Sequence, residues 1–207
     1  GCCVVQPKAQ PSLDELADRV AHKVGTKTAG LVFDESLFTG PEINPSWLSA
    51  DVPRYVEPIT PLNARNRMLT SRTPSTDTAR RFEAALNERG VTVTSVTAGV
   101  TPNRAKLIAS GQSAPLRDTA AAMIAFSDNT AAEILLRHTA IGQNQPASFE
   151  GGVKAVTTLL NEASLPTTGL VLADGSGMSR NNQISPLLLT DLLTASLNDD
   201  RFTALVT

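Results

Sequence analysis

The stretch Phe126-Ser-Asp-Asn-Thr-Ala-Ala-Glu-Ile-Leu-Leu-Arg-His138 decides the predicted fold. Apolar residues at helical spacing lead into it and out of it, so the stretch contains a corner between two helices. We expect these helices over residues 115–126 and 131–139. Thr130 followed by Glu133 matches a capping box, in which a hydroxyl and a carboxylate each accept a free backbone N–H at the start of a helix.

A cap at Thr130 leaves Ser127 and Asn129 on the turn, with their side chains pointing away from both helix axes. Asp128 lies between them, and we expect it to cap or brace the corner. By itself, Ser-Asp-Asn is a weak signal, because a polar turn without function has the same composition. Residues further along the chain bear on this choice.

Three further segments follow in order: Ser148-Phe-Glu-Gly-Gly152, Asp174-Gly-Ser-Gly-Met-Ser-Arg-Asn-Asn182 and Ser185-Pro186. Together with Ser-Asp-Asn, they resemble the D-alanyl-D-alanine carboxypeptidase/endopeptidase family of low-molecular-mass, class C penicillin-binding proteins. The close resemblance covers about residues 112–190, and a looser one extends back to about residue 12. It favours a functional corner over a plain polar turn.

Two motifs of that family are missing from the sequence. No serine has a lysine three positions later, as the nucleophile motif Ser-x-x-Lys requires, and Lys27-Thr28 is followed by Ala29 instead of the glycine of Lys-Thr-Gly. We interpret the chain as an internal portion of a larger enzyme, and a true pseudo-enzyme is the alternative. The chain alone is therefore expected to be inactive.

The resemblance implies that Ser127 and Asn129 are catalytic. A serine that attacks a D-Ala-D-Ala amide must lose a proton, and the leaving amine must gain one. Ser127 would relay this proton between a lysine and the leaving nitrogen. Asn129 would donate to the carbonyl of the substrate's penultimate peptide and accept from the lysine. The implied substrates are peptidoglycan stem peptides and β-lactams, and the implied reaction needs no cofactor.

The resemblance also implies a set of substrate-binding residues: Trp47, Asp51, Tyr55, Met178 and Arg180. The first three lie in a loop with prolines at 41, 45, 53, 58 and 61, which are too many for regular structure. Its two aromatic side chains can equally pack the loop onto the domain beneath. Arg180 would bind the carboxylate of a diaminopimelate-type stem side chain, and a solvated surface arginine is the alternative.

The segment around Ser176 invites a second hydrolase interpretation, in which Ser176 is the nucleophile. The nucleophile elbow Gly-x-Ser-x-Gly needs glycines two residues before and after the serine. Those positions hold Asp174 and Met178. We therefore reject this nucleophile and expect a tight turn in which Asp174 bonds its own backbone.

The chain is expected to form two domains with an α/β (α+β) fold. Residues 1–111 would be a small inserted α/β domain, and residues 112–207 the mainly helical subdomain of a penicillin-binding, β-lactamase-like transpeptidase domain. In the first, we expect helices over 13–24 and 77–89, a buried strand over 30–33 and a strand over 91–96. In the second, we expect further helices over 152–163 and from 186, and a strand over 169–173.

Composition excludes several other classes of protein. The 207 residues carry a net charge of -2 without a basic stripe, so nucleic acid is not an expected partner. We find no apolar run long enough to span a bilayer, and no metal-ligand spacing of His, Cys and carboxylates. We interpret His138 as a structural imidazole on the core-facing side of its helix. The oligomeric state and the preferred stem peptide stay open.

The location of the protein is inferred from the resemblance, which implies an extracytoplasmic place: the cell envelope, the periplasm or the medium. Gly1-Cys2 fits the end of a lipoprotein cleavage site, and a fragment boundary is the alternative. A membrane anchor therefore stays open. Cys2 and Cys3 are adjacent and fit poorly to a disulfide with each other.

A non-catalytic penicillin-binding-like module that holds cell-wall peptides is the second functional hypothesis. Covalent labelling of the full-length product by a fluorescent penicillin would favour the enzyme. Reversible binding of muropeptides without labelling would favour the module.

Overall fold

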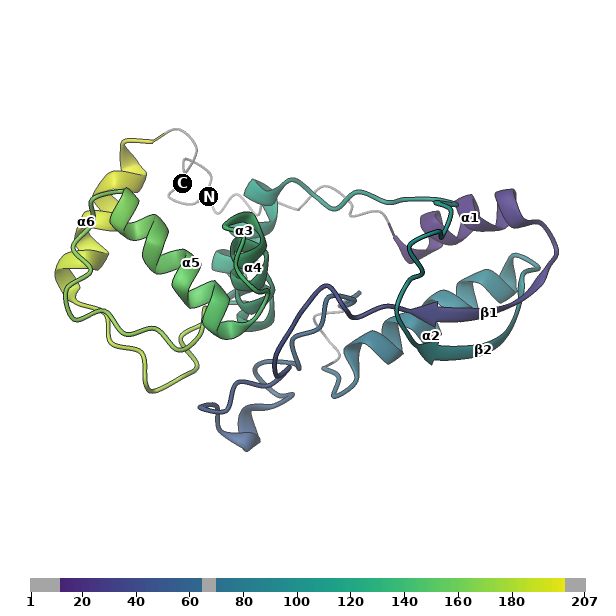
Figure 1. Cartoon of the computed structure of the whole chain (residues 1–207), viewed down its shortest axis with the longest axis horizontal. Coiled ribbons are helices and arrows are strands. Elements are labelled where there is room, and N and C mark those ends of the chain that lie inside the picture. Colours follow the sequence, from purple (N-terminus) through teal and green to yellow (C-terminus); the bar gives the residue numbers. More distant parts are fainter. Residues whose placement is uncertain (1–11, 65–69, 200–207) are drawn as a thin grey trace, which may run out of the picture. The chain divides into compact units, whose positions relative to one another are not determined.

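The computed structural model describes residues 12–64 and 70–199. These residues form two compact units (Figure 1). The first consists of the described parts of Gly1–Leu37 and Thr60–Pro115, and the second of Phe38–Ile59 and the described part of Leu116–Thr207. The proline-containing loop thus packs with the helices that follow residue 115. The predicted domains 1–111 and 112–207 kept this loop together with the residues on either side of it in the sequence. This division into domains stays a prediction.

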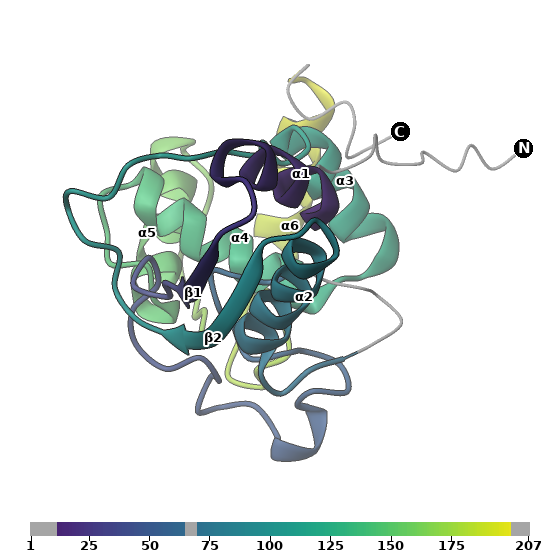
Figure 2. The ribbon, with the colours of Figure 1, turned by 90° about the vertical axis from the view of Figure 1, so that its right-hand side faces the viewer.

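The first unit alternates helices and strands: α1 (Leu13–Val24), β1 (Thr28–Phe33), α2 (Pro74–Glu88) and β2 (Thr92–Ala98). The two strands are parallel, with Thr28 opposite Thr92 and Phe33 opposite Ala98 (Figure 2). Small and aliphatic side chains from both helices and β2 form its core, and the fully or nearly buried ones are Ala17, Ala85, Leu86 and Val91. The predicted alternation of helices and strands is confirmed here.

The first strand is less buried than predicted. Val32 is 57% exposed, and the first three residues of β1 are exposed as well. A strand is buried on both sides only where other elements cover both faces of its sheet, and the exposed Val32 shows that one face of β1 is not covered in this way. The expectation of a buried strand over 30–33 is therefore wrong.

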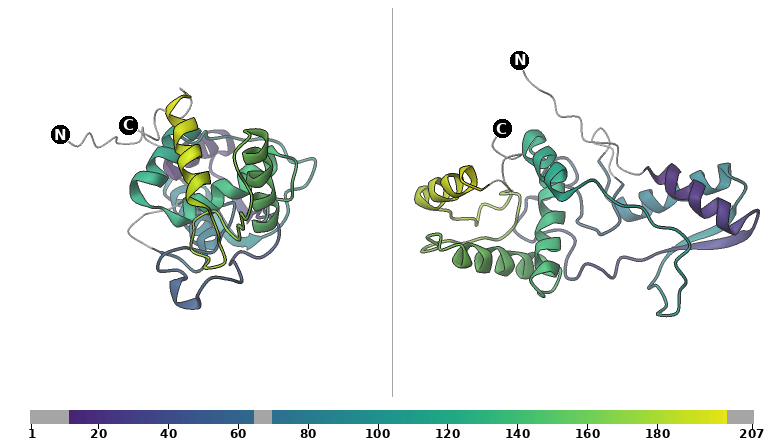
Figure 3. Two further views of the ribbon diagram at one scale, coloured as in Figure 1. Left: turned by 90° about the vertical axis from the view of Figure 1, so that its left-hand side faces the viewer. Right: turned by 90° about the horizontal axis from the view of Figure 1, so that it is seen from above.

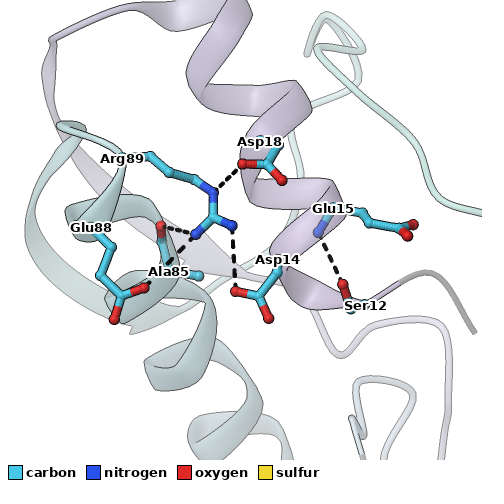
Figure 4. Close-up of polar contacts among 7 residues, drawn as sticks. All are labelled: Ser12, Asp14, Glu15, Asp18, Ala85, Glu88 and Arg89. Carbon is cyan, nitrogen blue, oxygen red and sulfur yellow. Dashed lines mark hydrogen bonds and ion pairs between the residues drawn. The ribbon is translucent and has the colours of Figure 1, made fainter.

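An arginine at the end of α2 ties this helix to α1 (Figure 4). Arg89 Nε donates to Asp18 Oδ1 at 2.5 Å, and Arg89 Nη2 lies 3.5 Å from Asp14 Oδ1. The hydrogen bond from Arg89 lowers the pKa of Asp18 below its usual value. Ser12 caps α1, because its Oγ accepts the N–H of Glu15 at 3.1 Å.

The second unit is mainly helical: a 3-10 turn η1 (Ser49–Asp51), α3 (Leu116–Phe126), α4 (Asn129–Gly142), α5 (Phe149–Glu162) and α6 (Pro186–Leu197). The yellow helix α6 faces the viewer in the left view of Figure 3. Serines cap the last two helices, since Ser148 Oγ accepts the N–H of Gly151 and Ser185 Oγ accepts the N–H of Leu188.

One predicted strand of this unit does not form. Residues 169–173 contribute only an isolated antiparallel bridge between Val171 and Gln183. The loop that follows Ala173 is held by side chains instead, as described below. On α5, Ala155 is buried and Leu159 is exposed, and on α6 the side chains of Leu189 and Leu193 are exposed.

Two consecutive glycines let α5 approach α4 closely. A Cβ atom at Gly152 would lie 2.4 Å from Leu136 Cγ and 2.8 Å from the Leu136 carbonyl oxygen. A Cβ atom at Gly151 would lie 2.0 Å from the carbonyl oxygen of Pro146. The backbone atoms in these contacts cannot move away without shifting α4 or the turn before α5, so only glycine fits.

Within residues 12–64 and 70–199, no helix combines the length and the apolar character that crossing a bilayer requires. Cys2, on which the question of lipidation depends, lies outside the described residues.

Gly152→Ala should lower the free energy of unfolding by about 1–3 kcal/mol, because overpacking forces α4 and α5 apart. Gly142→Ala is the matched control: Gly142 is the last residue of α4, and its Cβ would meet nothing within 4 Å. This control should be neutral or stabilising by up to about 1 kcal/mol. Chemical denaturation measures both, and equal effects would contradict the close packing.

Candidate functional site

The helix α4 starts two residues earlier than the capping box predicted. Asp128 Oδ1 accepts the N–H of Ala131 at 2.9 Å, so Asp128 is the cap and Asn129 the first helical residue. The prediction that Thr130 caps α4 is therefore wrong, and the capping role expected for Asp128 is confirmed. Thr130 is buried within the first turn, where its Oγ1 accepts the N–H of Glu57 at 3.0 Å.

Ser127 forms the turn between α3 and α4 in a strained conformation. Its φ is 50°, in the left-handed region that residues other than glycine rarely adopt. Such a residue typically costs about 1–3 kcal/mol, and strain of this kind clusters at functional sites. The side chain of Ser127 is exposed, and that of Asn129 is half-buried.

Asn129 brings together two segments that are distant in the sequence. Its Nδ2 lies 3.1 Å from the carbonyl oxygen of Tyr55 and 3.3 Å from Met178 Sδ. Asn129, Tyr55 and Met178, three of the predicted site residues, therefore meet at the start of α4.

Two further predicted residues, Asp51 and Arg180, lie close in sequence to Tyr55 and Met178 respectively. The carbonyl oxygen of Asp51, at the end of η1, accepts the N–H of Tyr55 at 2.8 Å. The Tyr55 side chain is 51% exposed, and the guanidinium carbon of Arg54 lies 5.0 Å from its ring centroid. Arg180 is exposed, two residues after Met178.

Trp47 lies in the interior of the second unit. Its side chain is buried, its Nε1 donates to Asp174 Oδ2 at 2.8 Å, and its ring packs edge-on against Phe149 with centroids 5.4 Å apart. This environment supports the packing alternative for Trp47. The exposed Tyr55 ring is not packed in this way.

Asp174 organises the loop that carries Met178. Its Oδ1 accepts from the N–H of Gly177 at 3.0 Å and from Asn182 Nδ2 at 2.7 Å. Its Oδ2 accepts from the N–H of Ser179 at 2.6 Å, in addition to the Trp47 indole. The prediction that Asp174 bonds its own backbone is confirmed, but the bond to Trp47 was not foreseen.

Glu133 holds the same loop from α4. Its carboxylate, fully buried, accepts the N–H of Gly175 at 3.0 Å and that of Ser176 at 2.8 Å. Burial raises the pKa of Glu133, and the hydrogen bonds from Ser176 and Gly175 oppose this rise. The capping-box pattern predicted a local partner for this carboxylate, and its bonds to the loop after Asp174 were not predicted.

Arg137, one helical turn further, is the largest fully buried side chain among the described residues. Its guanidinium donates to the carbonyl oxygens of Thr39 at 2.9 Å, Pro41 at 2.5 Å and Ala147 at 3.2 Å. It also lies over the ring of Phe149, 4.5 Å from its centroid. Glu133 and Arg137 lie four residues apart, on the same face of the helix as the apolar residues Leu136 and Ala140, and this was the available signal that both are buried.

His138 does not face the core as predicted. Its side chain is exposed and contacts the Phe38 ring edge-on, with centroids 5.5 Å apart. Arg137, its neighbour in the sequence, takes the buried position. In the part of the chain that the structure describes, no group of three or more His, Cys, Asp or Glu is placed to hold a metal ion.

Comparisons with known proteins give a consistent result. The D-Ala-D-Ala carboxypeptidase 3 (S13) family matches residues 62–207. The carboxypeptidase Rv3627c of Mycobacterium tuberculosis is 34% identical over 202 residues, which are 91% of this chain and 42% of that protein. The chain therefore spans less than half the length of this relative.

The fold is that of a penicillin-binding protein. The crystal structure of penicillin binding protein 4 (dacB) from Haemophilus influenzae matches 92% of this chain and 58% of its own, with a TM-score of 0.76 and 21% identity. Its complex with a novel β-lactam matches 66% of this chain and 33% of its own, with a TM-score of 0.56 and 30% identity. The predicted fold class is confirmed.

Thr130→Val should destabilise the protein by about 1–3 kcal/mol, because it leaves the buried N–H of Glu57 without its acceptor. Thr130→Ser keeps the hydroxyl and is the matched control. Hydrogen exchange of the Glu57 amide reports the change directly: exchange should accelerate in the valine variant only. Unchanged protection in Thr130→Val would contradict the assignment of this bond.

The raised pKa of Glu133 predicts a pH-dependent contribution to stability. The folded protein binds this proton more tightly than the unfolded chain, so the contribution is complete below the ordinary value of 4.5 and is lost as pH rises through the raised pKa. The stability difference between wild type and Glu133→Gln should therefore fall as pH rises from about 4 to 8 in urea denaturation. Glu150→Gln, on the exposed surface, is the control, and a flat difference for Glu133→Gln would refute the prediction.

Proposed function

The chain belongs to the D-Ala-D-Ala carboxypeptidase 3 (S13) family, and on this basis we propose that it supplies one wall of the active site of a serine-type D-Ala-D-Ala carboxypeptidase/endopeptidase. The observation that carries the proposal is the meeting of Asn129, Tyr55 and Met178 beside an exposed, strained Ser127. The substrates are peptidoglycan stem peptides, and β-lactams acylate the enzyme. The sequence holds no Ser-x-x-Lys, so the nucleophile and its lysine come from outside these 207 residues.

Ser127 is the proton relay in this proposal. Its hydroxyl can both donate and accept, which a relay between a lysine and a leaving amine requires. The left-handed backbone at Ser127 and the cap at Asp128 fix the turn from which the hydroxyl projects. No rearrangement of the turn is then needed during the reaction.

Asn129 positions the substrate. Its amide nitrogen carries two N–H donors, and one of its two contacts is the Met178 sulfur, which is a weak acceptor. A peptide carbonyl of the substrate is a better acceptor and would replace the sulfur at little cost. The contact to the Tyr55 carbonyl can persist and keep the amide oriented.

The side chain of the stem peptide binds along the segments that flank Asn129. Tyr55 offers an exposed aromatic face, and Asp51 and Arg180 offer opposite charges that suit the amine and the carboxylate of a diaminopimelate-type residue. Trp47 supports this wall from behind. An enzyme with such substrates acts outside the cytoplasm, at the cell envelope or beyond it.

The test is acylation of the full-length gene product by a fluorescent penicillin. Ser127→Ala and Asn129→Ala should each slow labelling by about a hundredfold or more, because each removes a relay or positioning group. Ser176→Ala is the matched control and should label at the wild-type rate. Labelling of Ser176 itself, or full-rate labelling of Ser127→Ala, would overturn the assigned roles.

The same assay addresses the non-catalytic module, which the missing Ser-x-x-Lys motif favours. A full-length wild-type product that binds muropeptides reversibly and never becomes labelled would be such a module.

A further inference from the structure

The loop that leads to Tyr55 and the loop that carries Met178 are connected by hydrogen bonds among buried or partly buried groups. Asn44 Nδ2 donates to the carbonyl oxygen of Ala173 at 2.6 Å, and the hydroxyls of Ser46 and Ser179 lie 2.7 Å apart. In a third bond, the indole of Trp47 donates to Asp174 at 2.8 Å. These bonds fix the positions of the two loops relative to each other.

Asp174 lies at the centre of these hydrogen bonds, and its side chain is almost fully buried. The side chain is only 3% exposed, so a charged carboxylate there must be satisfied by donors. It has four, shared equally between its two oxygens, and Trp47 provides the only one of them that comes from the other loop. Removal of the indole N–H leaves Oδ2 with the N–H of Ser179.

The hydrogen bond between Trp47 and Asp174 is connected to the site residues through the backbone around Met178. Asp174 binds the N–H groups of Gly177 and Ser179, the two neighbours of Met178 in the sequence. Met178 contacts the amide of Asn129, and the same amide contacts the carbonyl oxygen of Tyr55. A shift of either loop therefore changes the distance between Tyr55 and Met178, while Asn129 keeps its place in the first turn of α4.

We propose that Trp47 and Asp174 are positioning residues whose hydrogen bond sets the spacing between the Tyr55 and Met178 sides of the wall, and with it the selectivity for the stem side chain. Neither residue contacts the substrate in this proposal, which rests on the proposed function. It assigns to Trp47 an indirect role in place of the direct contact that the family resemblance implied.

The experiment compares Trp47→Phe with wild type in the full-length gene product. Phenylalanine keeps an aromatic ring against Phe149 but removes the N–H that Asp174 accepts. For a peptide that ends in D-Ala-D-Ala and carries a diaminopimelate-type side chain, kcat/KM should fall about tenfold, mainly through KM. Acylation by benzylpenicillin, which lacks such a side chain, should stay within about twofold of wild type.

A second variant and a control complete the test. Asp174→Asn should shift the selectivity in the same direction, since its amide group retains one acceptor oxygen in place of two. Ala17→Gly removes a fully buried methyl group from the first unit, and it should lower stability without a change of selectivity.

Equal losses for the peptide and for benzylpenicillin in Trp47→Phe would overturn the proposal, because they indicate a structural role alone. An unchanged peptide selectivity in Trp47→Phe would overturn it as well. In both cases, labelling of the wild type by penicillin would leave the proposed function standing, whereas its absence would remove the proposed function.

Discussion

The buried guanidinium of Arg137 is the contact on which the second unit depends. Irregular segments cannot satisfy their own backbone groups in an interior, so something else must do so. Arg137 donates to three carbonyl oxygens of the segments before α5 and around residue 40, and one turn earlier Glu133 accepts two N–H groups of the loop after Asp174. One face of α4 thus carries the donors and acceptors that allow long loops to pack as a core. Apolar side chains at these positions would leave those groups unpaired.

The candidate site uses the same helix as its foundation. Asn129 and Thr130, at the first turn of α4, bind Tyr55 and the backbone of Glu57, and both partners lie in the loop that Arg137 fastens from its other end. The first turn of α4 therefore helps to fix the positions of the site residues that the loops carry. A wall built in this way is preorganised, because its polar groups already have partners before a ligand arrives.

Local patterns predicted the helices and the corner, whereas distant contacts decided the details of the site. The helices expected from residues 13 and 186 begin there, and Ser12 and Ser185 cap them through bonds to residues only three positions away. Thr130 has the sequence of a cap but bonds to residue 57, and Glu133 bonds to residues 175 and 176. Helical periodicity likewise placed His138 towards the core, where Arg137 lies. No pattern in the sequence indicates partners so far along the chain.

The second unit is interrupted in sequence: Ile59 and Leu116 both belong to it, and the residues between them belong to the first unit together with residues before Phe38. This order matters during synthesis on the ribosome. Trp47 pairs with an aspartate 127 residues further on, so at about 5–20 residues per second its loop emerges roughly 6–25 s before its partner. The first unit, complete at Pro115, can fold during that interval. The indole of Trp47 then lacks its acceptor until Asp174 has been synthesised.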